Sequence, residues 1–127
     1  GIQDGTIDII ATDHAPHSAE EKSRGLEKSA FGIVGLETAF PVLYTGLVLT
    51  GVISLEKLVK LLSENPRHRF RIPLSGEDYC VWDLNAKYTI DPTGFRSMGK
   101  ATPFAGMEVC GRCMKTVYNG ETVYIEK

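Results

Sequence analysis

The stretch that decides the fold is Ile7-Asp8-Ile9-Ile10-Ala11-Thr12-Asp13-His14-Ala15-Pro16-His17. A short apolar run rich in β-branched residues suits a parallel strand buried on both faces, so we expect a strand over residues 7–12. An aspartate directly after such a strand lies at its carboxyl end, where α/β barrels gather their catalytic residues. Asp13 is therefore a candidate catalytic residue, although an aspartate in this position is also a common cap of the following turn.

The two histidines beside Asp13 are further candidates. Imidazole groups at His14 and His17 can ligate a metal or hydrogen-bond an anionic substrate, and either residue can also be purely structural. For His14 we favour hydrogen bonds that orient the loop. The polar run over residues 18–29 is expected to be an active-site loop or a solvated surface loop.

Two helices are predicted after this loop. Apolar residues recur at helical spacing over residues 36–49, and Gly51 is expected to end the first helix. Ser54 is a suitable N-cap for the second helix, which we expect to stop at Asn65-Pro66.

Strand and turn signals dominate beyond Pro73. Strands are predicted over residues 79–84, 87–90 and 114–117, and Asn119-Gly120 predicts a hairpin with a type I′ turn. The expected fold class is α/β, with residues 1–72 forming the C-terminal part of a barrel and residues 73–127 forming a small β module.

The amino-acid composition limits the kinds of molecule that the chain is expected to bind. The chain has 127 residues, of which 43% are hydrophobic and 24% are charged, with a formal net charge of -2. These values predict a globular protein with no basic face for nucleic acid and no membrane span, so we expect a cytoplasmic protein with a small-molecule substrate. No glycine-rich phosphate loop is present. Cys110 and Cys113 form a Cys-x-x-Cys without the second pair of a zinc ribbon, and we interpret them as two cysteines in a β segment.

Several motifs together resemble class I dihydroorotases of the amidohydrolase superfamily. They run along the whole chain and comprise Ala11-Thr12-Asp13-His14-Ala15-Pro16-His17, Glu20-Glu21-Lys22, Phe31-Gly32-Ile33-Val34-Gly35-Leu36-Glu37-Thr38, Asn65-Pro66, Asp83-Leu84-Asn85, Ser97-Met98-Gly99-Lys100 and Thr102-Pro103-Phe104-Ala105-Gly106. The resemblance implies the end of a (β/α) TIM-type barrel with a small flanking β domain.

The resemblance also implies an activity and its residues. Enzymes of this family interconvert L-dihydroorotate and N-carbamoyl-L-aspartate in pyrimidine biosynthesis, usually with zinc. Asp13 matches the family's metal-binding general base, His17 matches its substrate-binding histidine, and Phe31 and Gly32 match a backbone contact to the pyrimidine ring.

The resemblance leaves alternatives open. The family's His-x-His pair, its other metal ligands and its substrate-binding arginine have no counterpart in the chain, so we expect the remainder of the barrel to lie upstream in a longer polypeptide and this segment alone to be inactive. Another cyclic amidohydrolase, such as an allantoinase or hydantoinase, and a non-catalytic dihydroorotase-like subunit are the rival interpretations. Partners implied by the resemblance are a second copy in a homodimer or aspartate carbamoyltransferase.

Overall fold

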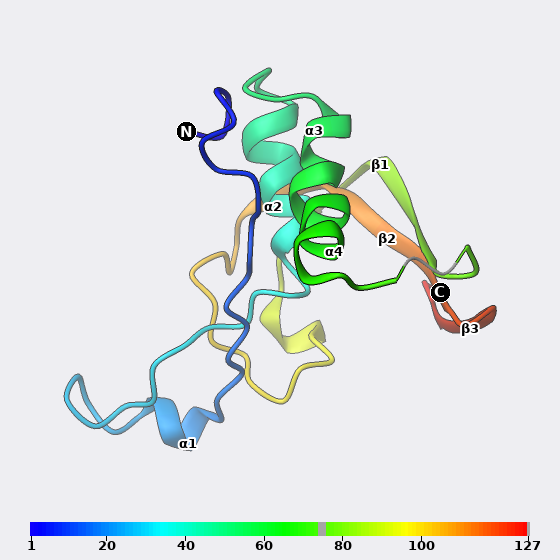
Figure 1. The fold of residues 1–127 in the computed structure, drawn as a ribbon. Coiled ribbons are helices and arrows are strands. Elements are labelled where there is room, and N and C mark those ends of the chain that lie inside the picture. The colour runs from blue at the N-terminus through cyan, green and yellow to red at the C-terminus, as the bar shows by residue number, and fades with distance from the viewer. Residues whose placement is uncertain (74–75, 127) are drawn as a thin grey trace.

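The computed structural model describes residues 1–73 and 76–126, which form a mixed α/β fold (Figure 1). Residues 74, 75 and 127 belong to the β module expected over residues 73–127 and lie outside the described residues. The elements follow in the order α1 (Ala19–Lys22), α2 (Ala39–Leu43), η1 (Tyr44–Val48), α3 (Leu55–Val59), η2 (Lys60–Glu64), α4 (Asn65–Phe70), β1 (Tyr79–Thr89), η3 (Pro92–Gly94), β2 (Glu108–Tyr118) and β3 (Glu121–Ile125).

The helices form the centre of the molecule. Figure 1 shows the segment before α1 running alongside them, while the loop that carries α1 projects away from the sheet. Leu58 of α3, Leu61 of η2 and Val34 have no exposed surface and lie in the core. The N–H of Ile10 donates to the C=O of Leu61 at 3.0 Å, which ties the N-terminal segment to this helical core.

Both predicted helices are present. The first starts three residues later than the predicted residue 36, at Ala39, whereas the second starts where its sequence signal places it. The first helix begins as α2, continues as the π-helix η1 and ends before Gly51. The second begins at Ser54, whose side chain accepts a hydrogen bond from the N–H of Lys57 at 3.1 Å. Such a bond satisfies one of the amide groups that a helix start leaves without a partner.

The prediction that Asn65-Pro66 ends the second helix is wrong. The helix continues through the π-helix η2 into α4 and ends at Arg71, which has a left-handed backbone with a φ of 54°. The N–H of Asn65 donates to the C=O of Lys60, five residues back. A wider π turn directly before Pro66 accommodates the proline, whose ring and missing N–H would disturb the regular α-helical bonds.

The strand expected over residues 7–12 is also not formed. Residues 7–12 have no regular secondary structure, no described residue pairs with them in a β ladder, and Ile7 is 47% exposed. An apolar run becomes a buried parallel strand only when neighbouring strands bond its backbone on both sides. Within residues 1–73 and 76–126 those neighbours are absent, because the described strands all belong to one sheet elsewhere in the chain.

That sheet has three antiparallel strands in the order β1-β2-β3. The strands predicted over residues 79–84 and 87–90 join into one long β1 with irregular pairing between Asp83 and Lys87, and β2 is longer than the predicted segment 114–117. Asn119 and Gly120 have φ values of 49° and 76°. Two consecutive positive φ values are what a type I′ turn requires, so the hairpin prediction is confirmed.

The sheet packs against the first helix. The ring of Phe40 in α2 lies 4.1 Å from the ring of Trp82 in β1, measured between centroids. The N–H of Cys110 in β2 donates to the hydroxyl of Thr45 in η1 at 2.9 Å. Cys110 and Cys113 both lie in β2 as free thiols, which confirms that they are cysteines of a β segment.

Candidate active site

The candidate site lies where the segment 13–17 meets residues 29–33, which follow α1 and are called the return arm of the α1 loop. His14 and Ile33 form a parallel β-bridge, and the N–H of Ala15 donates to the C=O of Ile33 at 2.9 Å. Asp13, His14 and His17 therefore lie on one segment, with Phe31 and Gly32 just before the paired residue of the adjacent one. The residues that the sequence singled out come from these two neighbouring segments.

Asp13 has a strained backbone. Its φ is 46°, in the left-handed region that few non-glycine residues adopt, although aspartate tolerates this region better than most. The residue is exposed, and its carboxylate forms no hydrogen bond or ion pair with the other described residues. Residues held in sparsely populated backbone conformations cluster at active sites.

His14 supports the turn after Asp13. Its Nδ1 accepts hydrogen bonds from the N–H groups of Gly35 at 3.1 Å and Leu36 at 3.2 Å. A ring nitrogen that accepts must be unprotonated, so these bonds define the tautomer and fix the ring. They agree with the orienting role that we favoured for this histidine.

His17 is partly buried beside the start of α1. Its Nδ1 lies 3.8 Å from Oε2 of Glu21. The same carboxylate accepts from the N–H of Ser18 at 2.8 Å, while the Ser18 hydroxyl accepts from the N–H of Glu21 at 3.2 Å. This is a capping box, and the Ser18 hydrogen bonds, with a smaller contribution from His17, lower the pKa of Glu21. Glu21 is therefore a carboxylate that caps the start of the helix beside His17.

Phe31 and Gly32 offer backbone rather than side-chain chemistry. The Phe31 side chain is 88% exposed, and Gly32 has a φ of 123°. A Cβ added to Gly32 would lie 2.3 Å from the Cβ of Ala15, so only glycine permits this approach of the two segments. The Phe31 N–H and C=O and the Gly32 N–H form no hydrogen bond with other described residues. These three groups are available to a ligand.

The carboxylate of Glu37, to which the sequence pattern alone assigned no role, anchors a further segment beside the site. Glu37 accepts from the N–H of Arg96 at 2.8 Å and from the N–H and hydroxyl of Ser97 at 3.0 and 2.6 Å. A Cβ added to Gly99 would lie 2.6 Å from the carbonyl oxygen of His17. The segment 96–101 thus packs tightly on His17, and Glu37 anchors it. Glu37 and Gly99 occur in the quoted motifs, but no spacing rule assigns them a role.

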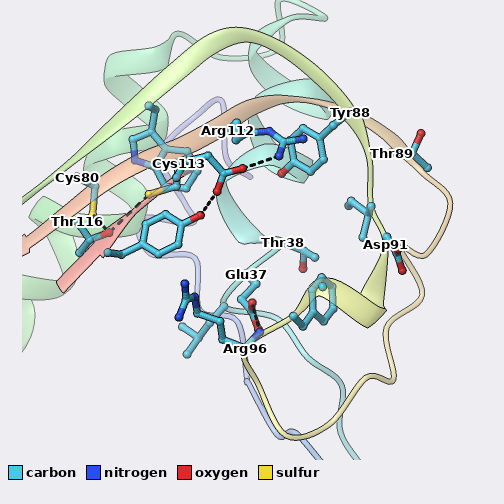
Figure 2. A pocket seen from close by; sticks show the side chains of 17 residues that line it. Glu37, Thr38, Cys80, Tyr88, Thr89, Asp91, Arg96, Arg112, Cys113 and Thr116 are labelled. Carbon is cyan, nitrogen blue, oxygen red and sulfur yellow. Dashed lines mark hydrogen bonds and ion pairs between the residues drawn. The ribbon is translucent and has the colours of Figure 1, made fainter.

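Two cavities border this region. One of about 450 Å³ is lined by His17, Ser18, Ala19, Lys22, Ser23, Met98, Lys100 and Ala101. Another of about 640 Å³ lies between the sheet, the segment 88–96 and residues 36–38, and its wall includes none of the predicted site residues (Figure 2). The smaller cavity is therefore the one that belongs to the candidate site.

Several polar side chains of the larger cavity bind one another. Arg112 donates to Glu126 at 2.7 Å and lies 4.3 Å from the centroid of the Tyr88 ring, and Tyr124 also donates to Glu126 (Figure 2). The hydrogen bond to Glu126 raises the pKa of Tyr124 to about 12. Such a hydrogen-bonded network stabilises the packing of the sheet.

The described residues fit one part of a metal site. Nowhere in residues 1–73 and 76–126 do three His, Cys, Asp or Glu side chains gather as a metal would need. The free carboxylate of Asp13 suits a single oxygen ligand to a divalent cation. Among the same residues, no helix combines the length and apolar character that a membrane span requires.

Curated relatives resemble the chain over its whole length. It is 53% identical over 133 residues to the dihydroorotase of Fusobacterium nucleatum, covering 100% of the chain and 31% of that protein. It is 51% identical over 130 residues to the dihydroorotase of Brevibacillus brevis, covering 98% of the chain and 30% of the relative. The chain therefore spans about 30% of the length of the curated relatives it matches. No model of a known protein family matches the chain.

Solved structures resemble it as well. The L-hydantoinase (dihydropyrimidinase) from Arthrobacter aurescens superposes with a TM-score of 0.87 at 33% identity, over 98% of the chain and 30% of that protein. The dihydropyrimidinase from Brevibacillus agri superposes with a TM-score of 0.89 over the same shares of both chains. At 24% identity, this second likeness concerns the fold alone.

Proposed function

Because the chain belongs to the dihydroorotase family, we propose that it supplies the Asp-His end of the active site of a dihydroorotase that interconverts L-dihydroorotate and N-carbamoyl-L-aspartate. The observation that carries this proposal is the 53% identity that extends over 100% of the chain, including the Asp13-to-His17 motif. We propose that the activity belongs to a longer polypeptide, called the complete polypeptide below.

The proposed architecture follows the resemblance. Residues 1–72 would be the C-terminal part of a (β/α) barrel, with residues 7–12 as its last strand, and residues 73–127 would be a small flanking β module. The superposition on L-hydantoinase over 98% of the chain supports this arrangement. Residues 7–12 would then gain the neighbouring strands that a buried apolar strand requires.

Asp13 would carry the proton in the reaction. In hydrolysis, a water molecule attacks the ring carbonyl carbon, and Asp13 takes a proton from that water. The carbon–nitrogen bond then breaks, and Asp13 returns the proton to the leaving nitrogen. Its exposed carboxylate, free of partners among the described residues, supports this role. A zinc ion held in part by Asp13 would lower the pKa of the water and polarise the carbonyl.

The other residues would bind the substrate. His17 and Lys100 line the same cavity, where an imidazole donor and an ammonium group suit the carboxylate of dihydroorotate. The free backbone groups of Phe31 and Gly32 would hydrogen-bond the amide edge of the ring. Formation of a homodimer, or association with aspartate carbamoyltransferase, stays a prediction.

A hydantoinase is the second candidate, because an L-hydantoinase is among the structural neighbours. The chain shares 53% identity with a dihydroorotase but 33% with that enzyme, which favours dihydroorotate. Assays of the complete polypeptide with dihydroorotate, hydantoin and allantoin discriminate these activities. Ring opening of hydantoin or allantoin in preference to dihydroorotate would overturn the substrate assignment, and no turnover of any of the three would favour a non-catalytic subunit.

The role of Asp13 is tested by Asp13→Asn in the complete polypeptide. Asparagine keeps the size and the tolerance of a left-handed backbone but cannot accept the proton, so we expect turnover to fall on the order of 10² to 10⁴-fold. Asp8→Asn is the control, because Asp8 is exposed on the same segment. Near-normal turnover of a folded Asp13→Asn variant would contradict the assignment.

A further inference from the structure

A lysine at the end of α1 joins the two arms of the candidate active-site loop. The Nζ of Lys22 donates to the C=O of Ala30 at 2.9 Å and to the C=O of Gly32 at 2.9 Å. We propose that Lys22 is a positioning residue that fixes the backbone on both sides of the Phe31–Gly32 peptide and so presents its polar groups to the substrate. The proposal rests on the proposed function and deepens it.

Peptide geometry explains how the two bonds act. In a trans peptide the N–H points opposite to the C=O of the same unit. Because Lys22 binds the Ala30 C=O, the Phe31 N–H of that unit points away from the lysine. The Gly32 C=O belongs to the unit after the Phe31–Gly32 peptide, so Lys22 restrains that peptide from both ends. The Phe31 N–H and C=O and the Gly32 N–H are the groups that remain without partners among the described residues.

No other contact of the described residues replaces this support at Phe31. Its side chain is 88% exposed and so packs little against the rest of the molecule. The main chain of α1 holds the return arm only before this point, since the N–H of Ala30 donates to the Glu21 C=O at 3.1 Å and the Ser29 hydroxyl donates to the Lys22 C=O at 2.8 Å. The lysine side chain extends this support across Phe31 to Gly32.

The effect of Lys22 reaches the segment that carries Asp13 and His17. Gly32 lies in close contact with Ala15, because a Cβ added to Gly32 would lie 2.3 Å from the Ala15 Cβ. Ala15 is two residues from both Asp13 and His17. Its N–H donates a hydrogen bond to the C=O of Ile33, the residue after Gly32. A shift of Gly32 would therefore displace the backbone of the segment that carries Asp13, the proposed acid/base, and His17, the proposed substrate-binding histidine.

The test compares Lys22→Met, Lys22→Arg and Lys28→Met in the complete polypeptide. Methionine keeps the length of the lysine and removes its donors, whereas arginine can still donate to two carbonyls. Lys28 is an exposed lysine of the same loop, and its side chain forms no hydrogen bond or ion pair with other described residues. The measurements are amide hydrogen exchange over residues 23–33 without substrate, the kcat and KM for dihydroorotate, and the unfolding temperature.

For Lys22→Met we expect exchange of the loop amides to be about 10-fold faster or more, since hydrogen bonds to a charged group correspond to roughly a 10- to 100-fold change. We expect KM to rise by about 10-fold with a smaller change in kcat, because binding groups are misaligned. Lys22→Arg should recover most of both effects, and Lys28→Met should show neither. If Lys22→Met does not fold, Lys22→Gln replaces it in the same comparison.

Two results would overturn the proposal. One is loop exchange in Lys22→Met that equals exchange in Lys28→Met, and the other is faster exchange with unchanged kcat and KM. If the unaltered complete polypeptide has no dihydroorotase activity, the proposed function fails, and the exchange comparison still decides whether Lys22 holds the Phe31–Gly32 backbone.

Discussion

Two residues with positive φ lie on the adjacent segments of the candidate active site, Asp13 at 46° and Gly32 at 123°. The residue pattern predicted Asp13 as functional, and the family resemblance implied a role for Gly32. Neither predicted the backbone conformations, because φ is set by the approach of segments that are 19 residues apart in the sequence. Gly32 allows its segment to touch Ala15, and Asp13, two residues before Ala15, is exposed. The close approach of the two segments is therefore a testable requirement.

Gly32→Ala should destabilise the folded chain more than Gly25→Ala. Alanine at either position strains the backbone, since Gly25 has a φ of 77°, but only at residue 32 does the new Cβ collide, at 2.3 Å from the Ala15 Cβ. We expect a loss of about 1 kcal/mol for Gly25→Ala and about 1–3 kcal/mol more for Gly32→Ala in the free energy of unfolding. Denaturant titration of both variants measures this difference, and equal losses would show that the two segments are not in close contact.

At the scale of elements, local signals predicted structure well and long-range pairing did not. Ser54 caps its helix and Asn119-Gly120 closes its hairpin, because both effects depend on residues within three or four positions. Pro66 was expected to end a helix, yet a π turn formed by residues upstream lets the helix continue. For residues 7–12 the pattern predicts a strand, but a ladder needs partners that the described residues lack.

The link between the start of α2 and the segment 96–101 depends on a charged carboxylate. Burial alone would raise the pKa of Glu37, but the side-chain hydrogen bond of Ser97 and the backbone hydrogen bonds of Arg96 and Ser97 outweigh burial and lower it. Glu37→Gln keeps one acceptor oxygen and places an amide donor against a backbone N–H. We expect it to lower the free energy of unfolding at neutral pH by about 1–2 kcal/mol, since the group is partly exposed.

The same carboxylate gives the effect a pH dependence of known sign. Because the pKa is lower in the folded than in the unfolded chain, the stabilisation is present above the unfolded value near 4.5 and is lost as pH falls through the folded value. The stability difference between the unaltered chain and Glu37→Gln should therefore shrink on acidification. Glu27→Gln, at an exposed position, is the control. A difference that is constant from pH 7 to below pH 4 would contradict the charged interaction.

At the scale of the whole molecule, apolar residues on the edge strands of the sheet are exposed to solvent. The strands β1 and β3 are the two edges of the sheet, and Val81, Val123 and Ile125 on them are 45%, 59% and 60% exposed. Residues 7–12 add a segment without a β ladder to other described residues. Exposed apolar edges of this kind favour pairing with further chain. They agree with a chain that spans about 30% of the length of its relatives.

The 127-residue polypeptide by itself should neither open dihydroorotate nor retain stoichiometric zinc, whereas the complete polypeptide should do both. A catalytic zinc site takes three protein ligands and keeps one position for water, but Asp13 is the only ligand proposed from this chain, and its described residues hold no group of three donors. Unpaired edges should also make the 127-residue polypeptide associate as its concentration rises, which sedimentation velocity detects. Zinc analysis and a ring-opening assay on both polypeptides, before and after treatment with a chelator, complete the test. Stoichiometric zinc together with turnover in the 127-residue polypeptide would show that its own residues build the metal site, and the proposal that the remaining ligands lie elsewhere in a longer chain would then fail.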